Sequence, residues 1–203
     1  SFEGKGEGFV HIRKTRMIHS IARYYVGQSG WDSAWGAPIN QEDMAGTNLA
    51  FSYIILNGLR KSGYTLTDKE QADYMYLWKF IGYQLGIEEN LLPDKYLGGF
   101  KLANLIKKRN FQYSKEGVEL THELMKYYES SAPKSQSKLV KSQVKYFLGR
   151  KISGFIGIET DPIKDALVEV ANGFSQLQNY FSLQQSSYGE MIRNFQQAKK
   201  NMA

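Results

Sequence analysis

Residues 14–25 read KTRMIHSIARYY, and the spacing of three side chains in this stretch indicates both a helix and a binding site. Arg16, His19 and Arg23 are three and four residues apart, so on an α-helix they share one stripe with the imidazole between two guanidinium groups. A neutral imidazole can ligate iron axially, and arginines one turn away can bond two carboxylates such as the propionates of haem. The stretch therefore predicts a helix that presents a cradle for haem.

The same stretch also has a purely structural interpretation. His19 has Met17, Ile18, Ile21 and Ala22 as sequence neighbours. A histidine on such an apolar helix is frequently a hydrogen-bonded core residue rather than a ligand. Spacing alone leaves both interpretations open.

Composition restricts the class of protein. A chain of 203 residues, 42% apolar and 14% aromatic, is typical of one globular domain, here with an extended helical tail. The absence of cysteine excludes disulfides, thiolate-ligated haem, thiolate-held iron–sulfur clusters and cysteine nucleophiles in this stretch. No run of 18 uncharged apolar residues predicts a membrane span. The chain starts at Ser1 without an initiating methionine or a signal-like apolar stretch, so we expect that residues upstream were removed or are not included. The compartment stays unknown, with the cytoplasm as best guess.

The net charge of +6 comes from the middle of the chain, where residues 101–151 carry 12 basic and 4 acidic side chains. Lys138, Lys141 and Lys145 share one helical face. The opposite face carries Val140, Val144, Phe147 and Leu148. We expect the lysines to form a solvated outer face, the alternative being peripheral contact with anionic lipid or an acidic partner.

Apolar residues recur at spacings of three and four between helix caps, which predicts an all-α fold. Asn40 followed by Asp43 predicts the start of a helix that runs through Phe51 and ends near Gly63. Thr67 to Glu70 is a capping box that opens the next helix, which contains Tyr74 to Leu85.

Three more helices and one loop follow. Asp94 and Ser114 are candidate caps for helices through Ile106 and Tyr128, and the serines around Pro133 predict a loop. Asp161-Pro162 predicts the start of the last long helix. Its apolar residues are spaced by four and three, which favours a bundle core over a dimer zipper: Ile163, Leu167, Val170, Phe174, Leu177 and Phe181.

Residues 27–38 form an irregular segment between the first two helices and contain Trp31 and Trp35. Two indole rings in a glycine-rich loop need apolar surroundings. They predict either a loop pinned to the core or the wall or lid of a cofactor pocket.

Taken together, these residues resemble the family of latex clearing proteins (rubber oxygenases) and mycophenolate-pathway oxygenases. The resemblance covers roughly residues 9–125. It lies in the Arg16-x-x-His19-x-x-x-Arg23 helix and in Trp35-Gly36-Ala37-Pro38-Ile39-Asn40-Gln41-Glu42-Asp43-Met44. Further matches are Thr47, Phe51, Gly58-Leu59, Gly63, Leu77-Trp78, Ile81-Gly82, Leu85-Gly86-Ile87 and Leu92-Pro93, with weaker ones at 114–117 and 120–121.

The resemblance implies a single globin-related helical domain around a b-type haem, with His19 as the axial iron ligand and Arg16 and Arg23 as flanking cofactor-binding residues. The glycines around Glu7 predict a flexible end at residues 1–8. We expect a haem-binding core at residues 9–152 and a C-terminal helical segment at residues 153–203 packed on that core. The implied activity is that of a haem-dependent oxygenase acting with dioxygen on an apolar olefin, isoprenoid in class. In rubber-cleaving relatives the distal acid and base lie upstream of the histidine helix, so the catalytic residues remain unknown.

Other chemistry is disfavoured. His122-Glu123 lacks a second histidine four residues on, because Lys126 occupies that position, so the zinc-protease motif is absent. His11 and His19 diverge by about 80 degrees on a helix, which makes them a poor pair of metal ligands. The lysines are not interleaved with aromatic stacking motifs, so nucleic acid is not an expected partner.

Three functions remain open. The favoured one is the haem-dependent oxygenase. The alternatives are a non-enzymatic helical binding module that uses the basic segment 101–151, and a haem-binding protein without oxygenase activity.

Overall fold

The chain is helical throughout the part that the structure describes, with α-helices, three short 3₁₀ turns and no strand among those residues. The structure, a computed structural model, describes the backbone of residues 6–131 and 137–182 and, within these ranges, the side chains up to residue 173. The predicted all-α fold is confirmed.

The chain divides into two compact units: residues 1–56 with 67–110, and residues 57–66 with 111–203. This division differs from the expected core at 9–152 and C-terminal segment at 153–203, because helices on both sides of residue 153 pack together in the second unit. Both units consist of similar amphipathic helices, so composition does not reveal the boundary. It falls within α3 (Tyr53–Lys61).

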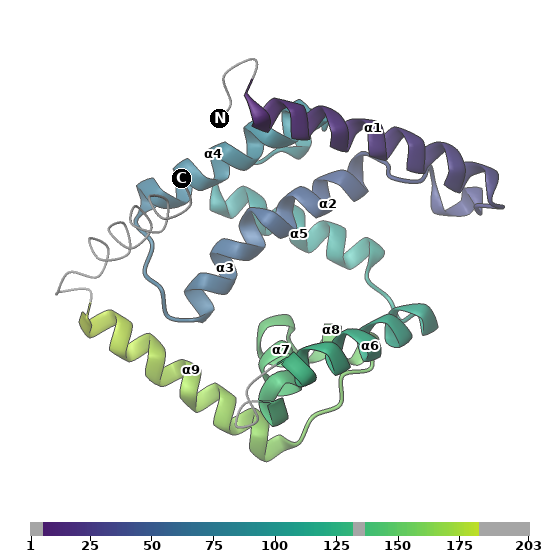
Figure 1. The fold of residues 1–203 in the computed structure, drawn as a ribbon. Helices are drawn as coiled ribbons and strands as arrows, with labels where there is room; N and C mark the ends of the chain where they lie inside the picture. Colours follow the sequence, from purple (N-terminus) through teal and green to yellow (C-terminus); the bar gives the residue numbers. More distant parts are fainter. Residues whose placement is uncertain (1–5, 132–136, 183–203) are drawn as a thin grey trace. The chain divides into compact units, whose positions relative to one another are not determined.

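The first unit is built on contacts among four helices. α1 (Glu7–Gln28) packs against α4 (Asp68–Leu85), and α2 (Gln41–Phe51) packs against both α4 and α5 (Tyr96–Asn110) (Figure 1). A 3₁₀ turn, η1 (Ser33–Trp35), lies between α1 and α2, and another, η2 (Glu89–Leu91), lies between α4 and α5. The core of this unit comprises Ala45, Leu49, Tyr53, Leu56, Met75, Ile87, Leu92 and Ile106, all buried.

Two predicted capping boxes are present. The Asn40 side chain accepts a hydrogen bond from Asp43 N at 3.0 Å, and Asp43 Oδ2 accepts one from Asn40 N at 3.0 Å. Thr67 and Glu70 make the same reciprocal pair at the start of α4. Gly86 then ends α4 in the left-handed conformation, with φ of 90°, which glycine adopts without steric cost.

One predicted helix is two helices in the structure. The helix expected from Asn40 to near Gly63 breaks at Ser52, where α2 ends and α3 begins. Ser52 is buried, and its hydroxyl donates to the Asn48 carbonyl at 2.9 Å. Bonds of this kind accompany bends in some helices, and apolar periodicity alone does not predict the break.

The expected flexible end at residues 1–8 is wrong for its last part. Gly6 is the N-cap of α1, and Glu7 and Gly8 lie in its first turn. Residues 1–5 lie outside the described residues. The glycines around Glu7 suggested flexibility, but a glycine at an N-cap is compatible with a regular helix start.

The second unit contains α6 (Lys115–Ser131), η3 (Ser137–Leu139), α7 (Val140–Leu148), α8 (Arg150–Phe155) and α9 (Pro162–Ser182). The predicted caps are present, since Ser114 Oγ accepts from Gly117 N and Asp161 Oδ1 accepts from Ile163 N, both at 2.8 Å. The loop predicted around Pro133 lies outside the described residues.

The predicted apolar seam of α9 is not a core where its side chains are described. Ile163, Leu167 and Val170 are 72%, 57% and 71% exposed, whereas Val168 is 3% exposed. The face that packs on α7 is mixed in polarity, because Asn172 Nδ2 also reaches Gln143 Oε1 at 3.4 Å. The spacing was read correctly as helical, but the buried stripe was assigned to the wrong face. The side chains of Phe174, Leu177 and Phe181 lie outside the described residues.

The lysine face of α7 is also not simply solvated. Lys145 Nζ donates to Asp165 Oδ2 at 2.6 Å and to Thr160 Oγ1 at 2.7 Å, and its side chain is only partly exposed. Lys141 pairs with Glu129 at 3.6 Å. These acidic partners come from neighbouring helices, so the sequence of α7 alone could not predict them.

Candidate functional site

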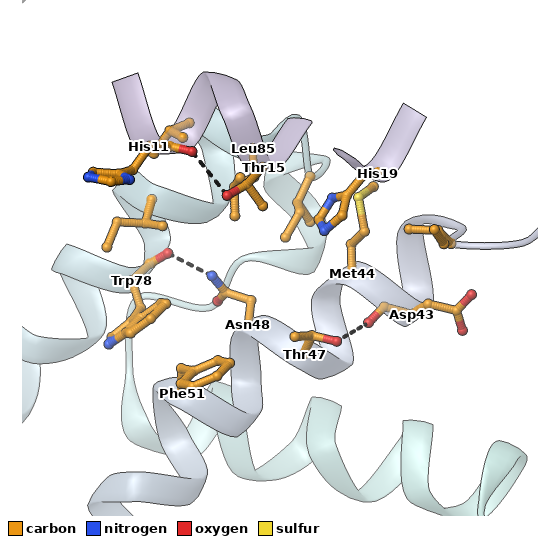
Figure 2. A pocket seen from close by; sticks show the side chains of 14 residues that line it. His11, Thr15, His19, Asp43, Met44, Thr47, Asn48, Phe51, Trp78 and Leu85 are labelled. Atoms are coloured by element: carbon orange, nitrogen blue, oxygen red, sulfur yellow. Dashed lines mark hydrogen bonds between the residues drawn. The ribbon is translucent and has the colours of Figure 1, made fainter. Parts of the chain in front are cut away.

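A pocket of about 610 Å³ lies among α1, α2 and α4 in the first unit (Figure 2). Its volume is in the range of sites that bind cofactors or small molecules. Fourteen residues line it: His11, Ile12, Thr15, His19, Ile39, Asp43, Met44, Thr47, Asn48, Phe51, Trp78, Ile81, Leu85 and Ile87. Most of these side chains are apolar, which favours an apolar ligand over water.

Helical periodicity explains how residues far apart in sequence meet in this pocket. On α1 the lining residues His11, Thr15 and His19 recur every four residues, and on α2 Thr47 and Phe51 do the same. Side chains at this spacing share a face, and each helix turns that face toward the pocket. Ile39 and Ile87 complete the lining from segments outside these helices.

His19 is the residue that distinguishes the pocket chemically. It lies near one end of the view in Figure 2, at the same end as Met44, while His11 lies at the other end. The Nδ1 atom of His19 is buried and has no hydrogen-bond partner. Buried polar atoms in folded proteins are nearly always bonded, so this unpartnered imidazole nitrogen needs a physical explanation, and a bound ligand is one.

The other polar side chains of the lining, apart from His11, are already bonded to backbone. Thr15 and Thr47 hydroxyls donate to the carbonyls of His11 and Asp43, each at 3.0 Å. Asn48 Nδ2 donates to Trp78 O at 3.0 Å, and the Asp43 carboxylate is part of the α2 capping box. The imidazoles are therefore the side chains of the lining best suited to exchange a ligand or a proton.

Arg16 and Arg23 do not line the pocket with His19. Arg16 Nη1 donates to Gln84 O at 3.3 Å, near the end of α4. Arg23 Nε and Nη2 donate to Pro38 O at 3.2 Å and Ile39 O at 2.7 Å. Their stripe on α1 is as predicted, but long side chains can reach along a helix, and these two reach backbone carbonyls of other segments.

The tryptophans of residues 27–38 neither line the pocket nor enter the core. Trp31 and Trp35 are 37% and 67% exposed and pack edge-to-face with centroids 5.2 Å apart. Trp31 Nε1 donates to Gly36 O at 2.7 Å. The predictions of a loop pinned to the core and of a pocket wall are wrong, because the two rings pack on each other, whereas a lid over the pocket stays a prediction.

Phe51 of α2 and Trp78 of α4 line the pocket, and their rings stack with centroids 5.3 Å apart (Figure 2). Ile54, Ile55 and Phe80 do not line it. The stripes of α2 and α4 could have been found by extending the helical spacing from Phe51 and Trp78. Ile39 and Ile87 have no such pattern, so sequence reasoning missed them.

Nothing in the described part of the chain brings together three or more His, Asp or Glu side chains that could hold a metal ion. A metal held by protein side chains alone generally needs several such ligands, whereas haem iron needs only an axial one. The described helices also include none long and apolar enough to cross a membrane.

The fold and the pocket define a class: an all-α protein with a mainly apolar cavity that contains a buried, unpartnered imidazole nitrogen. A family model described as the catalytic domain of ER-bound oxygenase mpaB/B' and rubber oxygenase matches residues 1–163. The chain belongs to this family, as the resemblance indicated.

The fold is shared with a solved structure of latex clearing protein in the closed state, with a TM-score of 0.76 at 20% sequence identity. The match covers 88% of this chain and 49% of that chain. The chain thus spans about half the length of that protein. Among curated proteins, none matches this chain significantly.

Proposed function

We propose that this chain forms the haem-binding part of an oxygenase, with His19 as the axial ligand of the iron. Its substrate would be an apolar olefin, isoprenoid in class, which reacts with dioxygen. The observation that carries the proposal is the buried Nδ1 of His19, which lacks a partner in a mainly apolar pocket. Membership of the oxygenase catalytic-domain family supports the choice of activity.

The pocket residues fit a haem group. Haem needs one side-chain donor for its iron and apolar walls for its macrocycle, and the lining offers His19 among isoleucines, Leu85, Met44 and Phe51. When bound, haem would supply the iron at which dioxygen reacts. The cysteine-free sequence leaves histidine, with Met44 as a soft neighbour, as the available axial donor in the lining.

The protein's own residues would bind and orient the olefin and would exclude water from the pocket. Backbone bonds hold the polar lining of α1 and α2, so these side chains do not compete with His19 for the ligand. The stacked rings of Phe51 and Trp78 would offer a flat surface to an olefin. An apolar wall also keeps water from the reacting centre, which protects reactive species from side reactions.

The role proposed for Arg16 and Arg23 as partners of haem propionates stays a prediction. Each guanidinium has five N–H donors and uses only one or two of them on backbone carbonyls. The remaining donors could bond a carboxylate at the edge of the pocket. Loss of one such charged bond should weaken cofactor retention by about 1.5–3 kcal/mol.

The test is the ultraviolet–visible spectrum of the full-length protein, as purified and after addition of haemin. We expect a strong Soret band that is lost or shifted in a His19→Ala variant and restored by free imidazole. The matched control is His11→Ala, which removes an imidazole from the same helix and the same pocket. An unchanged spectrum and unchanged haem content in His19→Ala would refute the assignment of this residue.

Oxygenase activity needs a separate measurement. Dioxygen consumption and cleavage products should be followed with short isoprenoid olefins and the haem-loaded protein. Products that disappear in His19→Ala would support the oxygenase. Normal haem loading without turnover of any olefin would favour the alternative of a haem-binding protein without this activity.

A further inference from the structure

Ile39 has an unusual backbone conformation at the wall of the pocket. Its φ is 53°, and within the described residues no other non-glycine residue has a positive φ. A β-branched side chain is disfavoured there because its methyl groups clash with the backbone. Such a conformation persists only where the surrounding structure enforces it, and it occurs frequently at ligand sites.

Arg23 supplies that constraint from α1. Its guanidinium donates to two consecutive carbonyls, Pro38 O at 3.2 Å and Ile39 O at 2.7 Å, in a partly buried setting. Bonds from a charged donor are stronger than neutral ones, and the planar fork fixes the direction of both carbonyls. The peptide groups before and after Ile39 are thereby held by one side chain.

Hydrogen bonds also hold the two residues after Ile39 in place. Asn40 begins the capping box of α2, and Gln41 bonds the backbone that follows α4. Gln41 Nε2 donates to Gly86 O at 3.0 Å, and Gln41 Oε1 accepts from Glu88 N at 2.9 Å. These bonds leave the segment little freedom to relax the strain at Ile39 while Arg23 is in place.

We propose that Arg23 is a positioning residue that acts through Ile39. It holds the Ile39 backbone in the left-handed conformation, so that the isoleucine side chain forms part of the pocket wall and helps to determine which apolar ligand fits. The proposal rests on the proposed function only in taking the pocket as a ligand site. Arg23 and the proposed iron ligand His19 are four residues apart on α1. This one helix would therefore both supply the iron ligand and position the pocket wall at Ile39.

The test is a double-mutant cycle on the full-length protein without haem, with the neutral fluorophore N-phenyl-1-naphthylamine as probe. The pocket component of binding is the part that a Thr47→Trp substitution abolishes, because an indole at that position would project into the cavity and occupy space that the probe needs. We expect Arg23→Ala and Ile39→Ala each to weaken this component about tenfold, which corresponds to 1.4 kcal/mol. The double variant should bind no more weakly than either single variant, because both changes remove the same wall.

Arg13→Ala is the matched control, since Arg13 is an exposed arginine on the same helix and away from the pocket lining. It should bind the probe like the unmodified protein. If the effects of Arg23→Ala and Ile39→Ala multiply in the double variant, Arg23 does not act through Ile39 and the proposal is overturned. The same conclusion follows if Arg23→Ala leaves probe binding unchanged.

A second variant covers the case in which Arg23→Ala does not fold. Arg23→Lys keeps the charge but loses the fork, so hydrogen exchange should accelerate in a peptide spanning residues 36–41 and remain unchanged in α4. Exchange that accelerates equally in both segments would indicate a general structural role and refute the proposal. Because the probe needs no iron, failure of haem binding would be recognised separately, by a missing Soret band alongside a normal cycle.

Discussion

A methyl group at Gly82 should disrupt the contact between the two helices that form most of the pocket. Gly82 lies in α4, and a Cβ there would lie 2.5 Å from Leu92 Cδ2 and 2.8 Å from Asn48 Nδ2. Both neighbours are buried, with Leu92 3% and Asn48 6% exposed, and Asn48 is held by its bond to Trp78 O. They cannot move aside without loss of packing or of that bond.

The expected magnitude follows from opposing terms. Overpacking of a tight contact costs about 1–3 kcal/mol, and displacement of the Asn48 bond adds about 0.5–1.5 kcal/mol. Alanine is favoured over glycine within a helix by about 1 kcal/mol, which offsets part of this cost. We expect Gly82→Ala to destabilise the protein by about 1–3 kcal/mol and to lower its melting temperature by roughly 2–10 °C.

The assay is thermal unfolding followed by circular dichroism, with Gly58→Ala as the matched control. Gly58 lies within α3, and a Cβ there would meet nothing within 4 Å, so this variant should melt slightly higher than the unmodified protein. A Gly82→Ala, Asn48→Ala double variant should lose less stability than the sum of the two single variants, because one of the side chains that clash with the new methyl group is gone. The reasoning is refuted if Gly82→Ala raises the melting temperature as Gly58→Ala does.

Two further predictions concern stability. Hydrogen bonds from Lys145 and, to a lesser extent, from Ser142 and Thr160 lower the pKa of Asp165 from its ordinary value of 3.8 to about 2. The ionised carboxylate therefore stabilises the fold above about pH 4, and this contribution is lost as the pH falls toward 2. The difference in melting temperature between the unmodified protein and Lys145→Met should therefore be largest near pH 5 and shrink by pH 2; a difference independent of pH would contradict the ion pair. Thr67→Ala should remove the capping box of α4 and cost about 0.5–2 kcal/mol in a denaturant titration, while Thr65→Ala, at an exposed threonine two residues earlier, should cost nothing measurable.

The predictable part of the fold is the part encoded by neighbours in sequence. The capping boxes at Asn40 and Thr67 and the cap at Ser114 are local pairs three residues apart, and each was predicted at the right position. The break at Ser52 was missed because apolar periodicity alone does not reveal it. The buried face of α9 was also missed, because packing on α7 selected Val168 over a more regular apolar stripe.

The candidate site likewise has a part that local sequence predicts and a part that it does not. The helical stripe that carries His19 follows from spacing, and the structure buries Nδ1 of that imidazole in a pocket. The partners of Arg16 and Arg23 are carbonyls 68 and 15 or 16 residues away, and no local pattern specifies them. Local sequence also does not specify the backbone conformation of Ile39, which depends on the side chain of Arg23 from α1.

This dependence gives α1 two roles that a sequence motif does not separate. A pattern of arginines three and four residues from a histidine suggests that all three contact one ligand. In the structure, however, at least two N–H donors of Arg23 bond the carbonyls of Pro38 and Ile39. A substitution of Arg23 would therefore alter both cofactor retention and pocket shape if both proposals hold. Haem titration and probe binding separate the two effects, because Ile39→Ala changes the wall while it leaves every donor of Arg23 in place. If Ile39→Ala retains haem normally and Arg23→Ala does not, the guanidinium contributes to cofactor binding beyond its effect on the wall.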